Sequence, residues 1–441
     1  MRSKLPYLFF FLSILLAMPA CKKLKDLYYD SDQIVEPSVA QLLTAMIDND
    51  RVRPSYWEIR TFVAMHTGIY SQSLAFLNNS NIYQQNPSYT QDRWNDFYRP
   101  GVNGGGVMAH YREIEKAYNA LPASVQADNR LFLEAARLLL YDQAAQMVDL
   151  WGDIPFSEAG SLNAKGEVIM PHFDDGAKVY DAILYDLAAA NEYWKAPQVS
   201  AAARAVFDKQ DILFQGNTEK WRSYANGLRL RLLMRISMVN EARAQPEVLQ
   251  MLQNPDEYPL PGEQQPYDPG QSDLLLRPLT SYTLNLRFAL TELYNYSAPE
   301  YLLEKVMKPA SDPRIPVMFD KYGRTVNEVF IPNATYKGLP MDKPAVEQQI
   351  MIGDCAILDS ATFLLNAGLP GIIMTGPEMD FLRAEAYQRW GGGDAAAAYD
   401  SALKKSIVFY YYLNSLNKIT RDPLPLPSSG EIQAFMQNDS I

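Results

Sequence analysis

Apolar residues recur at spacings of three and four along most of the chain after residue 37, a pattern typical of packed α-helices. The pattern is clearest in residues 129–150. The apolar face of this predicted helix consists of Leu133, Ala136, Leu140, Ala144 and Met147. The opposite face, which we expect to be wetter, consists of Glu134, Arg137, Gln143 and Gln146. Because the alanines are small, a neighbouring helix can approach closely.

Residues 217–237 predict a second helix, and Asn217 is its expected N-cap. Its apolar stripe consists of Trp221, Ala225, Leu228 and Leu232. On its more hydrated flank we expect Arg222, Arg229 and Arg235.

Residues 376–390 and 391–413 predict an antiparallel helix pair near the C-terminus, with Pro377 in the first helical turn and glycines between the helices. In the second helix, small, large and small residues follow at spacings of four and three, as in the second helices of tetratricopeptide repeats. These residues are Ala395, Tyr399 and Ala402. No regular 34-residue period is visible, so the pattern does not predict a regular solenoid.

Long polar segments separate the helical stretches. Residues 71–99 combine amides, hydroxyls and aromatic rings, and residues 253–282 are rich in proline. Loops of this length inside a compact fold are often functional. Residues 324–332 predict a small hairpin. We therefore expect a mainly α protein with long irregular loops and minor β-hairpins, in which the C-terminal helices form a tetratricopeptide-like pair.

Length and charge narrow the class of protein. At 441 residues the chain is long enough for several packed layers. Its net charge is −11, and without residues 1–20, which carry Arg2 and Lys4 but no acid, 38 basic and 51 acidic residues leave −13. This acidic balance argues against a nucleic-acid partner.

The N-terminus has the features of an export signal. Residues 1–20 combine a short basic start with an apolar stretch that is too short to span a membrane. Cys21 follows at the position of the lipidated cysteine in bacterial lipoproteins, although Met18 stands where the usual pattern has leucine. The alternative is an ordinary secretory signal followed by an unrelated cysteine. We expect residues 1–20 to be a signal peptide, residues 21–36 a polar tether and residues 37–441 a single helical domain.

Lipidation of Cys21 would leave Cys355 as the remaining cysteine, so no disulfide could form within the mature chain. We therefore expect Cys355 to be buried in the core.

The stretch from Trp151 to Glu158 raises the question of catalysis, because it places Asp153 and Glu158 around a proline turn. Termination of a helix explains these residues better. Gly152 supplies the left-handed geometry that closes a helix, and Pro155 prevents the helix from resuming. Asp153 is expected to accept hydrogen bonds from backbone N–H groups of the turn. We predict no catalytic role for this carboxylate pair.

No metal or other cofactor is expected. The histidines His66, His110 and His172 are far apart and lack ligand spacing. Asp174 and Asp175 are interpreted as a helix cap rather than a calcium loop. The glycines at 101–106 lack the Lys-Ser or Lys-Thr of a phosphate loop and predict a turn into a helix that begins at Val107.

Aromatic residues among amides are the candidate ligand site, because rings can stack on apolar faces of a ligand while amides bond its polar groups. The first cluster of candidate rings consists of Tyr83, Tyr89, Trp94 and Tyr98. Its candidate amides are Asn79, Asn81, Gln84 and Asn86. A second cluster consists of Tyr282, Tyr294 and Tyr296. The alternative is that Trp94 and Tyr98, which have helical spacing, belong to the core; Trp151 and Trp221 are expected to be packing residues.

Four segments resemble the signature segments of the SusD/RagB family, in its SusD-like starch-binding branch, and occur in the family's order. They are residues 138–159, 211–237, 311–319 and 376–407. The Gly-Asn-x-x-Lys-Trp element at 216–221 and the Leu-Arg-Leu-Arg-Leu element at 228–232 are the most specific parts. Two further elements of the family, Gln-Lys-Trp and Arg-Arg-Thr-Gly, do not follow, and we expect the domain to be short at its C-terminus.

The resemblance implies a non-catalytic lipoprotein of the outer membrane, anchored at the cell surface. Such a protein binds a glycan or related nutrient over a SusC-like TonB-dependent transporter. Two other functions stay open: a helical scaffold lipoprotein that binds only proteins, and a lipid-anchored glycoside hydrolase.

Overall fold

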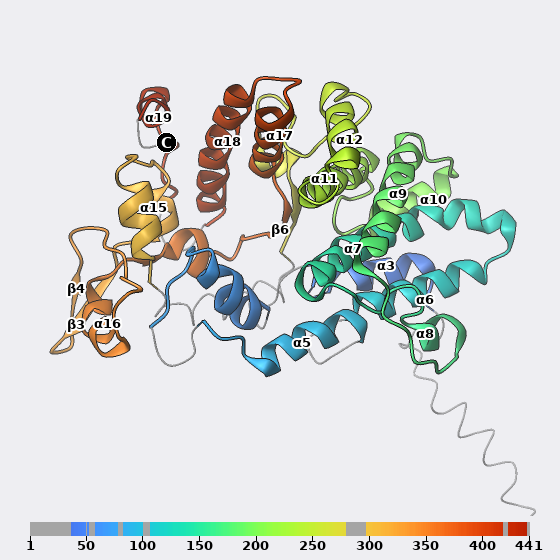
Figure 1. Ribbon diagram of the computed structural model, residues 1–441, viewed down its shortest axis with the longest axis horizontal. Helices are drawn as coiled ribbons and strands as arrows, with labels where there is room; N and C mark the ends of the chain where they lie inside the picture. The colour runs from blue at the N-terminus through green and yellow to red at the C-terminus, as the bar shows by residue number, and fades with distance from the viewer. Residues whose placement is uncertain are drawn as a thin grey trace, which may run out of the picture. The chain divides into compact units, whose positions relative to one another are not determined.

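The structure is a computed structural model that describes residues 37–49, 51–52, 58–77, 83–99, 106–278, 297–417 and 422–438. The described residues from Val39 onward belong to one compact unit, shown in Figure 1. Most of them lie in helices, which confirms the mainly α prediction. No helix among these residues is both long and apolar enough to cross a membrane.

The helices and strands differ widely in length. The longer α-helices are α3 (Val39–Ile47), α5 (Pro87–Tyr98), α6 (Val107–Asn119), α7 (Ala123–Trp151), α9 (Gly176–Lys195), α10 (Ala201–Gln210), α11 (Thr218–Ile236), α12 (Glu241–Gln253), α17 (Gly376–Trp390), α18 (Ala395–Ser415) and α19 (Ser429–Met436). The short ones are α8 (Ser161–Lys165), α13 (Pro269–Ser272), α15 (Ile315–Met318) and α16 (Ala345–Met351). The π- and 3₁₀-helical segments are η1 (Ile59–Gly68), η3 (Tyr301–Met307), η4 (Ile352–Asp354) and η5 (Ser360–Leu364).

The strands of the described part form antiparallel pairs. The pairs are β1 (Leu274–Leu276) with β6 (Gly371–Met374), β2 (Phe319–Asp320) with β5 (Ile357–Leu358), and β3 (Gly323–Val326) with β4 (Val329–Pro332). The β3–β4 pair confirms the predicted hairpin. Its turn residues Asn327 and Glu328 have φ of 49° and 65°, the left-handed geometry of a tight hairpin turn.

Helix α7 lies in the middle of the main core and contacts α3, α6, α9 and α11. All five residues of its predicted apolar face are buried. The prediction of a wet opposite face was wrong for Glu134 and Gln143, which are also buried, because other helices cover α7 on that side. Glu134 is paired there with Arg130 and Arg137 of the same helix, at 3.0 and 3.1 Å.

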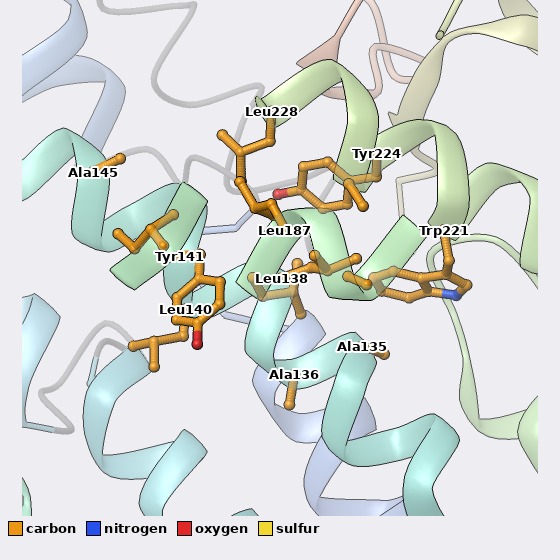
Figure 2. Close-up of a cluster of buried hydrophobic side chains, with 14 of the residues drawn as sticks. Ala135, Ala136, Leu138, Leu140, Tyr141, Ala145, Leu187, Trp221, Tyr224 and Leu228 are labelled. Carbon is orange, nitrogen blue, oxygen red and sulfur yellow. The ribbon is translucent and has the colours of Figure 1, made fainter. Parts of the chain in front are cut away.

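Helix α11 begins as predicted, since the side chain of Asn217 accepts a hydrogen bond from the backbone N–H of Lys220. Figure 2 shows Trp221, Tyr224 and Leu228 of α11 in one cluster with side chains of α7 and α9. The predicted stripe is buried, and Trp221 is fully buried, which confirms its packing role.

The hydrated flank predicted for α11 was wrong for Arg222 and Arg229, which are 6% and 8% exposed. Helix α12 and the turn after it cover this flank. Arg222 donates to the side chain of Asn191 at 3.1 Å and to the carbonyl of Glu257 at 2.7 Å. Arg229 pairs with Glu247 at 2.8 Å. Buried arginines of this kind need internal acceptors, which a sequence pattern alone does not reveal.

Helices α17 and α18 pack side by side (Figure 1), as predicted for the C-terminal pair. Thr375 and Asp394 cap their N-termini. The buried positions of α18 do not match the predicted tetratricopeptide spacing, however. Tyr399 is 41% exposed, and the buried alanines of α18 are Ala398 and Ala402, so the inward stripe differs from the predicted one.

Two loop predictions have different outcomes. Residues 87–98, predicted as part of a long loop, form helix α5, because Asn86 caps its N-terminus and Pro87 is preorganised for the first turn. Residues 253–278 are mostly irregular, as predicted. Cys355 is buried as predicted, and burial raises the pKa of its thiol to about 11.

Asp211 provides a test of how the core is held. Its carboxylate accepts hydrogen bonds from the backbone N–H groups of Leu213, Phe214 and Gly216 and from the indole of Trp221, at 2.7–3.1 Å. We predict that Asp211→Ala lowers the free energy of unfolding by about 3 kcal/mol, because these buried donors lose their acceptor. Chemical denaturation followed by circular dichroism measures this change.

Asp208→Ala is the matched control, since Asp208 is half exposed and pairs only with Arg204 in the described part of the chain. An Asp211→Ala loss no larger than that of Asp208→Ala would contradict the assigned role.

Candidate ligand-binding site

Three segments bring aromatic rings together around α5. Trp94 of α5 meets Trp151, the last residue of α7, edge-on with ring centroids 5.3 Å apart. On the segment before α9, Phe173 stacks against Trp94 at 6.1 Å with an interplanar angle of 22°. Phe173 is 62% exposed, so this group of rings reaches the surface. We call Trp94, Trp151 and Phe173 the aromatic platform.

The end of α7 places Trp151 in the platform. Gly152 has φ of +73° and its N–H donates to the carbonyl of Val148, which closes the helix as predicted. The expected role of Asp153 was wrong in detail. Its carboxylate accepts from the N–H of Gly176, the first residue of α9, at 2.9 Å rather than from its own turn. Ile154 and Asp174 also form an antiparallel bridge. The residues after Trp151 are therefore fixed to the start of α9.

Two adjoining cavities open along the platform and helix η1. One, of about 450 Å³, is lined by Gln85, Pro87, Thr90, Gln91, Trp94 and Trp151. The other, of about 220 Å³, shares Gln85, Thr90 and Trp151 with it and adds Phe62, His66, Thr67, Tyr70 and Leu150. Neither lining includes a carboxylate, lysine or arginine. Flat rings beside amide and hydroxyl groups suit a neutral polyhydroxy ligand.

The predicted site residues on this surface have different roles. Trp94 and Tyr98 both pack against the core, and Trp94 also lines a cavity. Tyr98 contacts Trp94, and burial raises the pKa of its phenol. Tyr83 is 44% exposed and contacts Tyr70, which lies just after η1. The hydroxyl of Tyr89 accepts from Arg60 at 3.0 Å.

The predicted amides are only partly placed. Gln84 is exposed, and Asn86 is engaged as the N-cap of α5. The remaining predicted residues lie outside the described part of the chain: Cys21, Asn79, Asn81, Tyr282, Tyr294 and Tyr296.

Sequence reasoning missed several residues of this surface. Trp151, expected to be a packing residue, is half-buried and lines both cavities. Its position directly before a helix-ending glycine was the available signal, because a terminal side chain has neighbours on one side only. Phe173, Phe62 of η1 and Tyr70 just after η1 gave no signal, since they reach this surface only through tertiary contacts.

His172 holds the segment that carries Phe173. Its Nδ1 lies 2.8 Å from the carboxylate of Glu158, and its Nε2 lies 3.1 Å from that of Asp174. Both contacts are favourable hydrogen bonds only when both ring nitrogens carry protons. The hydrogen bond and charge of Glu158, with a smaller contribution from Asp174, raise the pKa of His172 above its usual value of 6.5. The pKa values of Glu158 and Asp174 are lowered.

These shifts predict a pH-dependent platform. The charged contacts are present below the ordinary histidine pKa and are lost as pH rises through the raised pKa; at the acid end they are lost as the two carboxylates protonate. We expect the stacking of Phe173 on Trp94 to loosen as the pH rises above 6.5 and through the raised pKa of His172. The measurement is the fluorescence of Trp94, obtained as the difference between wild type and Trp94→Phe.

His172→Gln should remove this transition, whereas His110→Gln should keep it, because burial lowers the pKa of His110 and its charged neighbour is Glu113. A transition that survives in His172→Gln would assign it to another group.

No group of three or more histidine, cysteine, aspartate or glutamate side chains in the described ranges is arranged to hold a metal ion. His66, His110 and His172 lie on η1, on α6 and before α9, respectively.

Comparison with known proteins defines the class. A SusD-like family model, described as starch-binding and associating with the outer membrane, matches residues 32–421. The chain belongs to this SusD-like family, whose members are outer-membrane-associated binding proteins. No curated protein matches the sequence.

Solved structures share the fold. A chitin-binding protein has a TM-score of 0.68 at 20% identity, over 90% of this chain and 79% of its own. A SusD homologue from Bacteroides fragilis has a TM-score of 0.64 at 16% identity, over 92% and 79%. A chitin-binding SusD homologue from Flavobacterium johnsoniae has a TM-score of 0.63 at 21% identity, over 84% and 70%.

Proposed function

We propose that the protein binds a glycan at the aromatic platform without cleaving it and passes it to a SusC-like TonB-dependent transporter. The observation that carries the proposal is the meeting of Trp94, Trp151 and Phe173 beside two cavities with uncharged linings. Stacked rings bind sugar faces without requiring a charge on the ligand. Membership of a starch-binding family and the chitin-binding relatives support this ligand class.

The proposal includes a lipid anchor at Cys21, residues 1–20 as a signal peptide, residues 21–36 as a tether and residues 37–441 as one binding domain. The position of Cys21 after an apolar stretch supports the anchor. In this arrangement the protein lies at the outer-membrane surface, where a transporter can receive the glycan.

The local chemistry favours binding over hydrolysis. A glycoside hydrolase needs two carboxylates free to act as acid and as base or nucleophile. Beside the platform, Glu158 and Asp174 are both bonded to His172, and Asp174 also accepts from Ser157. Release of reducing ends from a glycan panel would overturn the non-catalytic assignment.

The platform is tested by binding of chitooligosaccharides and maltooligosaccharides, measured by isothermal titration calorimetry. We expect Trp94→Ala and Trp151→Ala each to weaken binding by about tenfold, because each removes a stacking surface. Trp390→Ala is the matched control: Trp390 is half-buried on α17 and its indole donates to Glu241.

Equal affinities in Trp94→Ala, Trp151→Ala and Trp390→Ala would remove the platform as the binding site. No binding to any oligosaccharide, with the protein folded, would favour the scaffold that binds only proteins.

Transfer to a transporter has its own test. Purification of the tagged protein from detergent-solubilised outer membranes should recover a TonB-dependent barrel. Cys21→Ser should leave the membrane fraction, because one lipid signal is lost. Recovery of no barrel with a folded, membrane-bound protein would contradict the transport role.

A further inference from the structure

A third cavity, of about 250 Å³, adjoins the smaller aromatic cavity and shares Phe62 and Thr67 with it. Its lining carries charged side chains, unlike that of the aromatic cavity. Three arginines contribute, Arg51, Arg93 and Arg231, together with the carboxylates Glu58 and Asp142. The guanidinium of Arg93 lies over the ring of Phe62, 4.7 Å from its centroid. Phe62 therefore separates an uncharged surface from a charged one.

The two carboxylates that line this cavity are already engaged. Glu58 forms an ion pair with Arg93. Asp142 accepts the hydroxyl proton of Tyr224 at 2.6 Å and lies 3.5 Å from Arg231. Arg231 in turn makes two hydrogen bonds to Glu378, at 2.6 and 2.9 Å. Arg93 and Arg231 thus have carboxylate partners within the protein.

Arg51 differs from these arginines. It is 4% exposed, and no ion pair joins it to a carboxylate in the described part of the chain. Its Nη2 donates to the backbone carbonyl of Arg93, but its Nε and Nη1 have no hydrogen-bond partner. Burial lowers the pKa of Arg51, against the opposing charges of Glu58 and Asp96. A buried cation with two unpartnered N–H groups and no carboxylate ion pair is costly, so a partner from outside the chain is chemically expected.

Two further buried atoms of the lining lack partners: Nε of Arg93 and Oε1 of Gln143. The unsatisfied groups are therefore guanidinium N–H donors and a single amide acceptor. A ligand with an anionic acceptor and a hydroxyl donor satisfies both kinds, and the anion also balances the charge of Arg51. A neutral sugar offers no charge to balance Arg51.

We propose that this cavity is a subsite for one acidic sugar residue of the uronic acid type. Its carboxylate accepts hydrogen bonds from Arg51 and Arg93, and one of its hydroxyls donates to Gln143. The subsite rests on the proposed glycan-binding function, and it names the ligand class: an oligosaccharide whose neutral rings lie on the aromatic platform and whose acidic residue occupies this cavity.

The test uses the full chain and two probes that differ only at one carbon, D-glucuronate and D-glucose. Glucuronate should raise the melting temperature of the wild type, and glucose at equal concentration should not, because ligand binding stabilises the folded state. Arg51→Met keeps the length of the side chain and removes the charge. In this variant we expect affinity for glucuronate to fall at least about tenfold, as for loss of a charge-assisted hydrogen bond.

Two controls keep the result interpretable. Arg204→Met removes a half-buried arginine of α10, which lines none of the three cavities, and should bind glucuronate as the wild type does. Chemical denaturation should show that Arg51→Met remains folded, because replacing a buried cation that has no carboxylate ion pair with an apolar side chain is often neutral or stabilising.

Equal effects of glucuronate and glucose would overturn the subsite, as would full glucuronate binding by Arg51→Met. Either result, together with retained binding of chitooligosaccharides or maltooligosaccharides, would leave the proposed function standing. Glucuronate binding that depends on Arg51 but not on Trp94 or Trp151 would instead support the cavity and contradict the aromatic platform.

Discussion

Burial of α7 is the constraint on which the rest of the structure depends. The polar side chains that α7 buries against other helices are removed from water, so each is stabilised by an acceptor or donor inside the protein. Glu134 is paired within the helix, and Asp142 receives the hydroxyl of Tyr224 and faces Arg231. These bonds fix how α11 lies against α7. The same contacts hold one wall of the charged cavity, so the core and the candidate subsite share their supports.

The surface site depends on where this helix ends. Gly152 stops α7 directly after Trp151, and Asp153 binds the first N–H of α9. The connection between α7 and α9 is therefore fixed at both ends. His172 and Asp174 tie the remaining segment to Glu158 and Ser157. Phe173 then projects toward Trp94 from a segment held by charge, and its position is more sensitive to pH than that of rings held by packing.

The helices could be predicted because their signals are local. Asn217 as an N-cap, Gly152 as a stop and the apolar stripe around Ala136 and Ala144 need no knowledge of distant contacts. The buried arginines could not be predicted in the same way. Arg222 is covered by residues more than thirty positions further along the chain. The spacing of residues within α11 does not indicate that these residues bury it.

For the candidate site too, the sequence indicated the residues with local signals but not those that meet through tertiary contacts. The rings and amides of residues 83–98 indicated a binding surface, and Trp94 lies on it. Helix α5 itself was missed, because its sequence is polar and its start depends on the cap by Asn86. Trp151, Phe173 and Phe62 come from three separate segments, and only the packing of η1, α5 and α7 brings them together.

The charge distribution explains how such a site can discriminate between ligands. The chain carries a net charge of −11, which repels an acidic polymer at long range. The neutral rings of the aromatic platform do not change this repulsion. They therefore do not select among sugars by charge. The guanidinium of Arg51, which has no carboxylate ion pair in the described part of the chain, does change it, because an uncharged ligand leaves its charge unbalanced while an acidic ligand balances it. Discrimination then comes from the cost of the unsatisfied cation rather than from added contact area, and it acts only on the one residue that enters the cavity.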